Sequence, residues 1–263
     1  MKILRVLALA MALMLFAGAC GGGDDEEANE GAGAAATEAG ETPEETAHAE
    51  HTEFCEGMVA AETAVLAAAS GGDPGDIEGL LATVEETAPA ELEAQLEVVL
   101  STVRLGLQKQ DGSVFESEEF TTNDEELDAW LADNCGFATV DVSVVDYAFE
   151  GVPETLAPGT TTFTFTNDGE EVHEMIMVRY KDESLTIKDL MKLSDKEAEK
   201  QLEFLGASFG PPGTVDTESR SLAAGKYALV CFIPVGATSE KALRKADGPP
   251  HIAKGMSAEF IVQ

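Results

Sequence analysis

The spacing of apolar residues changes near residue 136, and this change most restricts the folds open to the chain. Between residues 53 and 135, apolar side chains recur every three or four positions, as on one face of an α-helix. From residue 139 onward, several runs alternate apolar and polar residues, as in strands that are buried on one face. The sequence therefore predicts an α+β multidomain chain, with a small helical bundle followed by a β-sandwich.

Residues 53–135 are expected to form a helical domain. Apolar positions define helices within 54–66, 77–84, 92–103 and 127–131, and Thr122-Asn123 is expected to cap the last of them. The domain begins near Cys55 and ends at Cys135. In an exported protein such a pair is usually oxidised, so we expect a Cys55–Cys135 disulfide.

Residues 136–263 are expected to form the sandwich. Alternating runs predict strands around 140–144, 162–166, 172–180, 226–233 and 257–262. Asn167-Asp168-Gly169 is a strong turn signal between two of these runs. Residues 185–205 and 239–246 mix apolar residues with charges, and we expect them to be helical insertions between strands.

The first residues have the pattern of an export signal. Lys2 and Arg5 precede a 14-residue apolar run, which is too short to span a membrane. The small residues 17–19, directly before Cys20, resemble the lipobox of bacterial lipoproteins. That resemblance implies a signal peptide over 1–19, lipidation of Cys20 and a membrane anchor on the extracytoplasmic face, in the periplasm or at the cell surface. Residues 20–52, rich in Gly, Ala and Glu, are expected to be a disordered acidic tether.

Charge excludes one large class of partner. The chain has 50 acidic and 16 basic residues, a formal net charge of −34. Nucleic acid is therefore not expected as a ligand, because phosphate binding needs a Lys/Arg surface. The acidic surface favours a basic protein partner instead. The chain is not expected to be an enzyme, since it has neither an HExxH motif nor a Ser/His/Asp grouping.

Four residues of the second half carry metal-binding chemistry: His173, Cys231, His251 and Met256. With Cys20, Cys55 and Cys135 otherwise assigned, Cys231 is an odd free thiol in an exported protein. Two imidazoles, one thiolate and a weak axial thioether are the ligand set of a blue-copper site. Asn167 is expected to brace the surrounding loops. The alternating pattern directs Glu174 away from His173, which favours Met175 as its neighbour.

The pattern of these residues resembles the cupredoxins, small copper proteins of the plastocyanin and sulfocyanin kind. The resemblance rests on Pro158-Gly159-Thr160, Phe163 and Asn167-x5-His173, and then on Gly225-Lys226-Tyr227, Cys231 and His251-x4-Met256. It covers about half of the chain. It implies an eight-strand Greek-key sandwich, one type 1 copper ion held by the four residues, and electron transfer to a redox partner protein. In this interpretation His251 lies near the surface as the electron port.

One feature departs from the cupredoxin pattern. Nineteen residues separate Cys231 from His251, where cupredoxins usually have two to four. Because the entropy of loop closure grows slowly with length, the loop can still return to the site, and Gly248-Pro249-Pro250 could stiffen the return. Two other functions remain open: a copper carrier or sequestration protein, and a metal-free cupredoxin-like binding module.

Overall fold

The structure is a computed structural model that describes residues 51–263. Residues 1–50 lie outside the described part, and with them the expected signal peptide, Cys20 and most of the expected tether. Among the described residues, no helix is both long and apolar enough to cross a membrane. The order along the chain is a group of helices followed by two β-sheets, as predicted.

Four α-helices form the N-terminal part of the described residues, which we call the helical module. They are α3 (Thr52–Ala69), α4 (Ile77–Thr87), α5 (Glu93–Lys109) and α6 (Glu118–Asn134), with the short 3-10 turns η1 (Ala90–Leu92) and η2 (Gly112–Glu116). The apolar positions that define the periodicity, among them Leu81, Leu96 and Leu127, are buried together in one core. The helical prediction for this part is confirmed.

Two boundaries of the module differ from the predictions. The last helix is capped by Ser117, whose hydroxyl accepts from the amide of Phe120, so it begins before the predicted cap at Thr122-Asn123. The expected tether also ends earlier than residue 52. His51 packs edge-on against Trp130, with ring centroids 5.1 Å apart, and Thr52 begins α3. A side chain that packs on a ring belongs to the module rather than to a spacer.

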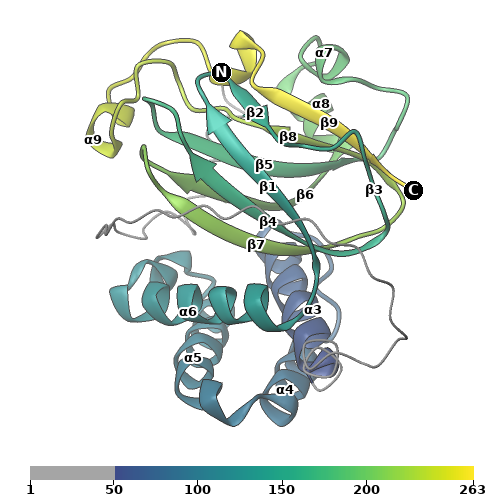
Figure 1. Ribbon diagram of the computed structural model, residues 1–263, viewed down its shortest axis with the longest axis vertical. Helices are drawn as coiled ribbons and strands as arrows, with labels where there is room; N and C mark the ends of the chain where they lie inside the picture. Colours follow the sequence, from purple (N-terminus) through teal and green to yellow (C-terminus); the bar gives the residue numbers. More distant parts are fainter. Residues whose placement is uncertain (1–50) are drawn as a thin grey trace, which may run out of the picture.

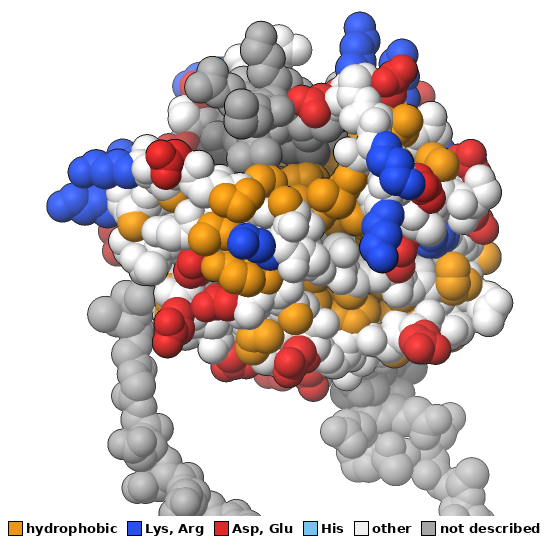
Figure 2. Space-filling model, turned by 90° about the horizontal axis from the view of Figure 1, so that it is seen from above, with side chains coloured by type: hydrophobic (Ala, Val, Ile, Leu, Met, Phe, Trp, Pro, Cys, Tyr) orange, Lys and Arg blue, Asp and Glu red, His pale blue; other side chains and the backbone are white. Residues whose placement is uncertain are grey.

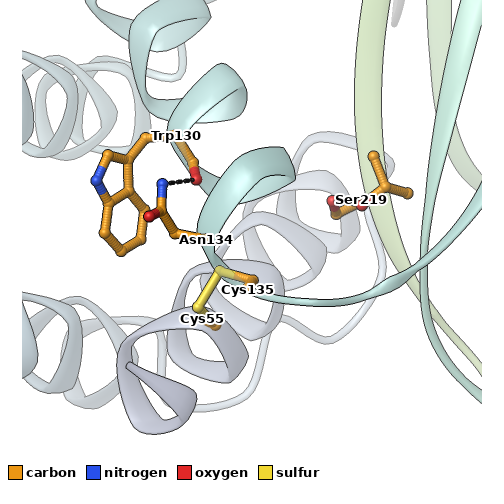
Figure 3. The surroundings of a disulfide bond; sticks show 6 residues. Cys55, Trp130, Asn134, Cys135 and Ser219 are labelled. Carbon is orange, nitrogen blue, oxygen red and sulfur yellow. Dashed lines mark hydrogen bonds between the residues drawn. A yellow bond between two sulfur atoms is a disulfide. The ribbon is translucent and has the colours of Figure 1, made fainter. Parts of the chain in front are cut away.

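The expected disulfide joins the two ends of the helical module. Cys55 in α3 and Cys135 after α6 are bonded, with their Cα atoms 5.7 Å apart (Figure 3). Both cysteines are buried in the module's core. Nearby, the side chain of Asn134 donates to the carbonyl of Trp130 and satisfies an acceptor near the end of α6. The disulfide therefore connects the first helix of the module to the point where the chain enters the sheets.

Nine strands of the described chain form a sandwich of two mixed sheets. One sheet has the order β2-β1-β4-β7 and the other β3-β9-β8-β5-β6. The strands are β1 (Ala138–Val145), β2 (Ala148–Glu150), β3 (Thr155–Leu156), β4 (Gly159–Asn167), β5 (His173–Tyr180), β6 (Leu202–Gly210), β7 (Val215–Leu222), β8 (Gly225–Val230) and β9 (Ser257–Val262). Most pairs are antiparallel, but β1 pairs with β4, and β3 with β9, in parallel. The resemblance to cupredoxins implied eight strands, so the described chain has one strand more than expected.

The expected strand positions are confirmed, but two long strands, β6 and β7, were not predicted. Residues 202–205 were expected to be helical, yet the short helices α7 (Ile187–Leu190) and α8 (Asp195–Gln201) end before β6 begins. The strand β7 was missed because its buried positions include Glu218, Ser219 and Arg220. These polar side chains are covered by protein, so the usual alternation of apolar and polar residues is absent. The second insertion contains only the single-turn helix α9 (Glu240–Leu243).

The helical module lies against one face of the sandwich. Figure 1 shows α3 and α6 beside β7, below the two sheets. Across this junction the guanidinium of Arg220 in β7 forms an ion pair with Glu62 in α3, at 2.7 Å. The short helical turn η3 (His251–Lys254) lies at the opposite, upper end of the sandwich in this view.

Candidate metal centre

Three of the predicted ligands meet at one point in the fold. The possible ligand atoms of His173, Cys231 and His251 all lie within 4.8 Å of one another, and all three side chains are buried. The Nδ1 atom of His251 is 3.4 Å from the sulfur of Cys231 and 3.1 Å from Nδ1 of His173. Residues separated by as many as 78 positions in the sequence therefore share one small volume.

Each of these three candidate ligands lies at, or directly next to, the end of a regular element. His173 is the first residue of β5, and Cys231 directly follows β8, which pairs with β5 in the same sheet. His251 opens the turn η3. The fourth predicted residue, Met256, is fully buried in the same apolar cluster as Cys231, and its amide donates to the carbonyl of His251. Paired strands thus hold two of the ligands in a fixed relation.

The 19-residue segment between Cys231 and His251 closes tightly at its base. The amide of His251 donates to the carbonyl of Ile233, and the amide of Ile252 donates to the carbonyl of Cys231, both at 2.8 Å. Pro234 and Pro250 form an antiparallel bridge next to these bonds. Residues 232–235 and 249–252 therefore form a short hairpin stem, which holds both ends of the segment next to the site.

Each of the two imidazoles forms a hydrogen bond to a carboxylate through its Nε2 atom. Nε2 of His173 is 2.6 Å from Asp146, and Nε2 of His251 is 3.1 Å from Glu171. Because an ionised carboxylate can only accept, each Nε2 carries the proton that it donates, and each Nδ1 is left with a lone pair. The two lone pairs point toward one another beside the sulfur. Such an arrangement suits a cation between them.

Hydrogen bonds hold both carboxylates ionised. Burial alone would raise the pKa of Asp146, but bonds from His173 and from the amide of Glu170 hold it below its usual value. Burial likewise opposes ionisation of Glu171, but the amide of Gly236, Nε2 of His251 and the hydroxyl of Tyr147 donate to that carboxylate and lower its pKa. The pKa of His251 is lowered mainly by burial, which favours its neutral form. A neutral imidazole is the form that binds a metal.

Burial makes the Cys231 thiolate depend on a partner cation. Burial, and then the negative charge of Glu174, raise the pKa of Cys231 well above its usual value. The thiol therefore keeps its proton until a positive charge arrives to replace it. The amide of Glu174 donates to the sulfur at 3.5 Å, which fixes the direction of the sulfur lone pairs.

The structure corrects one expectation about the surroundings of the site and adds a role for Glu174. His251 was expected near the surface, but its side chain is 0% exposed, because Tyr147 and Glu171 cover it. Glu174 was expected to point away from His173, yet its carboxylate contacts the segment that follows Cys231. Its carboxylate accepts from the amide of Phe232 at 2.7 Å and so fixes the residue after Cys231. Burial raises the pKa of Glu174 to about 7, against the effect of that bond.

Asn167 braces the loops as expected. Its side-chain amide donates to the carbonyls of Glu171 and Gly210, and its oxygen accepts from the amide of Gly169. Sequence reasoning missed Asp146, Tyr147 and Glu171. The available signals were positional: Asp146 directly follows the first strand, and Glu171 lies two residues before His173.

Comparison with solved structures finds auracyanins and rusticyanins. A reduced auracyanin from Roseiflexus castenholzii is 20% identical, with a TM-score of 0.32, over 48% of this chain and 97% of that one. Auracyanin A of Chloroflexus aurantiacus, described as a "blue" copper protein, is 16% identical, with a TM-score of 0.31, over 49% of this chain and all of that one. Rusticyanin from Thiobacillus ferrooxidans is 20% identical, with a TM-score of 0.28, over 48% and 77% of the two chains.

The sequence comparisons add no relative. No protein-family model matches the chain, and the search of curated proteins finds no match. At the identities and scores above, the chemistry of the site has to be inferred from its own residues.

Proposed function

We propose that this chain binds one type 1 copper ion at His173, Cys231, His251 and Met256 and transfers single electrons. The observation that carries the proposal is the convergence of two Nδ1 lone pairs and one sulfur, with both Nε2 atoms bound to carboxylates. Two imidazoles, one thiolate and a long axial thioether make up a blue-copper site, whereas structural zinc sites use four strong ligands. The donor set therefore fits copper best.

The protein's contribution to electron transfer is a rigid, dry pocket. When bound, copper supplies the one-electron couple. Asp146 and Glu171 hold the two rings in place, and Glu174 holds the backbone next to Cys231. The surrounding cluster includes Met175, Val172 and Ala237, each 0% exposed, so water is excluded. Ligands held in one geometry need little rearrangement between two redox states, and this favours fast transfer.

Tyr147 is the proposed outlet for the electron. Since His251 is fully buried, it cannot contact a partner directly. The ring of Tyr147 packs edge-on against that of His251, with centroids 4.8 Å apart, and Tyr147 is only partly buried. Replacement of Tyr147 by Leu should slow electron exchange with a small oxidant while leaving the absorption spectrum of the site unchanged.

The redox partner is a further part of the proposal. A basic partner is favoured by the overall charge of −34. At the end of the sandwich farthest from the helical module, acidic side chains do not dominate the surface. Figure 2 shows exposed hydrophobic side chains there, with both basic and acidic side chains around them. A partner that docks on this end would therefore meet a mixed surface, and ionic strength should affect its association only moderately.

We also propose that lipid on Cys20 holds the protein on the extracytoplasmic face of a membrane. The support is the basic start, the short apolar run and the small residues before Cys20. Metabolic labelling with a fatty acid tests this. Label should appear in the native chain and be lost from a Cys20→Ser variant, and retention of label in the variant would contradict the anchor.

A visible absorption spectrum tests the copper site. One equivalent of Cu(II) added to the full chain should produce an intense thiolate-to-copper band, and Cys231→Ser should abolish it. Replacement of Met256 by Leu should keep the band and raise the reduction potential, because the axial thioether is lost. A colourless chain that binds no copper would contradict the proposal and leave a metal-free binding module.

Copper exchange separates electron transfer from copper delivery. The hairpin stem and the full burial of the ligands predict slow release of copper to a competing chelator. Release within seconds would instead favour a carrier or sequestration protein.

A further inference from the structure

A cavity lies between the helical module and the sandwich. It measures about 280 Å³ and is lined by α3, α5 and α6 on one side and by β6, β7 and their connecting turn on the other. Its apolar wall includes Met58, Val65, Phe115, Phe120, Phe204 and Phe209. Pockets between two structural units are frequent binding sites for small molecules.

The charged side chains of the cavity are strongly unbalanced. Among the residues that the structure describes, six carboxylate residues line it, and Arg220 is the only basic residue that does. Arg220 already has two ion-pair partners, because its guanidinium lies 2.7 Å from Glu62 and 2.8 Å from Glu218. Asp124 and Asp128 also line the cavity. One buried cation thus faces several acids, and the acids outnumber the basic groups that could pair with them.

Glu218 supplies an unpartnered acceptor inside the cavity. Its side chain is 6% exposed, and one of its carboxylate oxygens accepts from Arg220 while the other, Oε1, has no hydrogen-bond partner. Gly206 permits this placement, since a Cβ there would lie 2.4 Å from Nη2 of Arg220 and 2.7 Å from Oε2 of Glu218. A buried carboxylate oxygen without a donor is costly, and a bound donor would remove that cost.

The spacing of these acids does not suit a bare metal ion. Among residues 51–263, only His173, Cys231 and His251 form a group of three whose ligand atoms lie within 4.8 Å of one another. No three carboxylates around Arg220 form such a group. A larger cation, with several N–H donors and an apolar part for the aromatic wall, matches both the spacing and the lining.

We propose that this cavity binds an amphipathic organic cation, a primary ammonium with a short alkyl chain. The ammonium group would lie among Glu62, Asp124 and Glu218 and donate to the free oxygen of Glu218. The alkyl chain would lie against Phe115 and Phe120. This site is separate from the copper ligands and goes beyond the proposed electron transfer.

Isothermal titration calorimetry on the full-length protein tests the proposal with three probes that have alkyl chains of equal length. Octylammonium should bind with a 1:1 stoichiometry. Octanol, which lacks the charge, should bind at least tenfold more weakly, and octanoate should not bind. Glu218→Gln and Asp124→Asn should each weaken octylammonium at least tenfold. The matched control is Glu97→Gln, an exposed acid of α5 outside the cavity, which should have no effect.

Several outcomes would overturn the proposal. Equal binding of octanol and octylammonium would show that the cavity binds apolar groups without selecting a cation. Binding of trilysine without binding of octylammonium would point to a basic peptide instead. Because Glu218→Gln could disturb the junction, a Phe120→Ala variant provides a second test. It should weaken octylammonium but leave the copper spectrum unchanged, so failure here is distinct from failure of the copper proposal.

Discussion

The Nδ1 atoms of His173 and His251 lie 3.1 Å apart, while the opposite nitrogen of each ring is bound to a carboxylate. Two neutral rings in this arrangement place lone pair against lone pair. The carboxylates of Asp146 and Glu171 therefore leave the Nδ1 atom of each ring available for a cation, and they place negative charge close to it.

Removal of that charge should raise the reduction potential of bound copper. In Asp146→Asn the amide oxygen can still accept from His173, so the ring keeps its position. At an effective dielectric constant of 20 and a separation of about 7 Å, one charge contributes roughly 2 kcal/mol, or about 100 mV for one electron. A redox titration checks the shift. Glu170→Gln, at an exposed neighbouring acid, is the control, and equal shifts in both variants would contradict a specific role for Asp146.

Gly169 should be essential to the geometry of the site. A Cβ at this position would lie 2.7 Å from Nε2 of His173 and 2.5 Å from Oδ1 of Asp146. Gly169→Ala should therefore displace His173 and lower copper affinity at least tenfold, which is about 1.4 kcal/mol. Competition with a chelator measures this. Gly57→Ala, within α3, meets only ordinary contacts at 3.5 Å and should leave copper affinity unchanged.

The disulfide should stabilise the fold without affecting the metal. Cys55 and Cys135 close a loop of 80 residues. In the chain-entropy model such a loop is worth about 4.5 kcal/mol at most. The double variant Cys55→Ser, Cys135→Ser should unfold at a lower urea concentration, by up to that free energy. Its copper spectrum should match that of the native chain, and loss of the blue band would show that the helical module supports the site.

Stability should fall as the pH rises from 5 to 8. Burial raises the pKa of Asp124 to about 7 and that of Glu218 to about 7, while in the unfolded chain both titrate near 4. Between these values the folded chain binds more protons than the unfolded chain. The free energy of unfolding therefore decreases with rising pH and loses this contribution above about pH 7.

Urea unfolding at several pH values measures this dependence. Asp124→Asn cannot titrate, so its free energy of unfolding should change less between pH 5 and 8. Glu97→Gln serves as the control for the general charge of −34. Identical slopes in Asp124→Asn and the native chain would count against the buried acids as the cause.

Local patterns in the sequence were enough for most elements and for the candidate ligands. The helical period of residues 53–135 and the alternation in β1, β4, β5, β8 and β9 follow from which side chains must leave water. Cys231 stood out because the other cysteines had assignments, and Cys55 pairs with Cys135 in the structure as expected. The strand β7 could not be found in this way, because the side chains that it buries against the helical module are charged.

The site's environment is a property of the tertiary structure. Asp146 reaches His173 across 27 positions and Glu171 reaches His251 across 80, because the sandwich brings strand ends together. No local pattern records such pairs. The same holds for the burial of His251 and for the pairing of Arg220 with Glu62. The sequence by itself determined which residue types were available and how each segment is shaped. Packing between distant segments decided which groups meet, which are desolvated, and where buried acids outnumber basic groups.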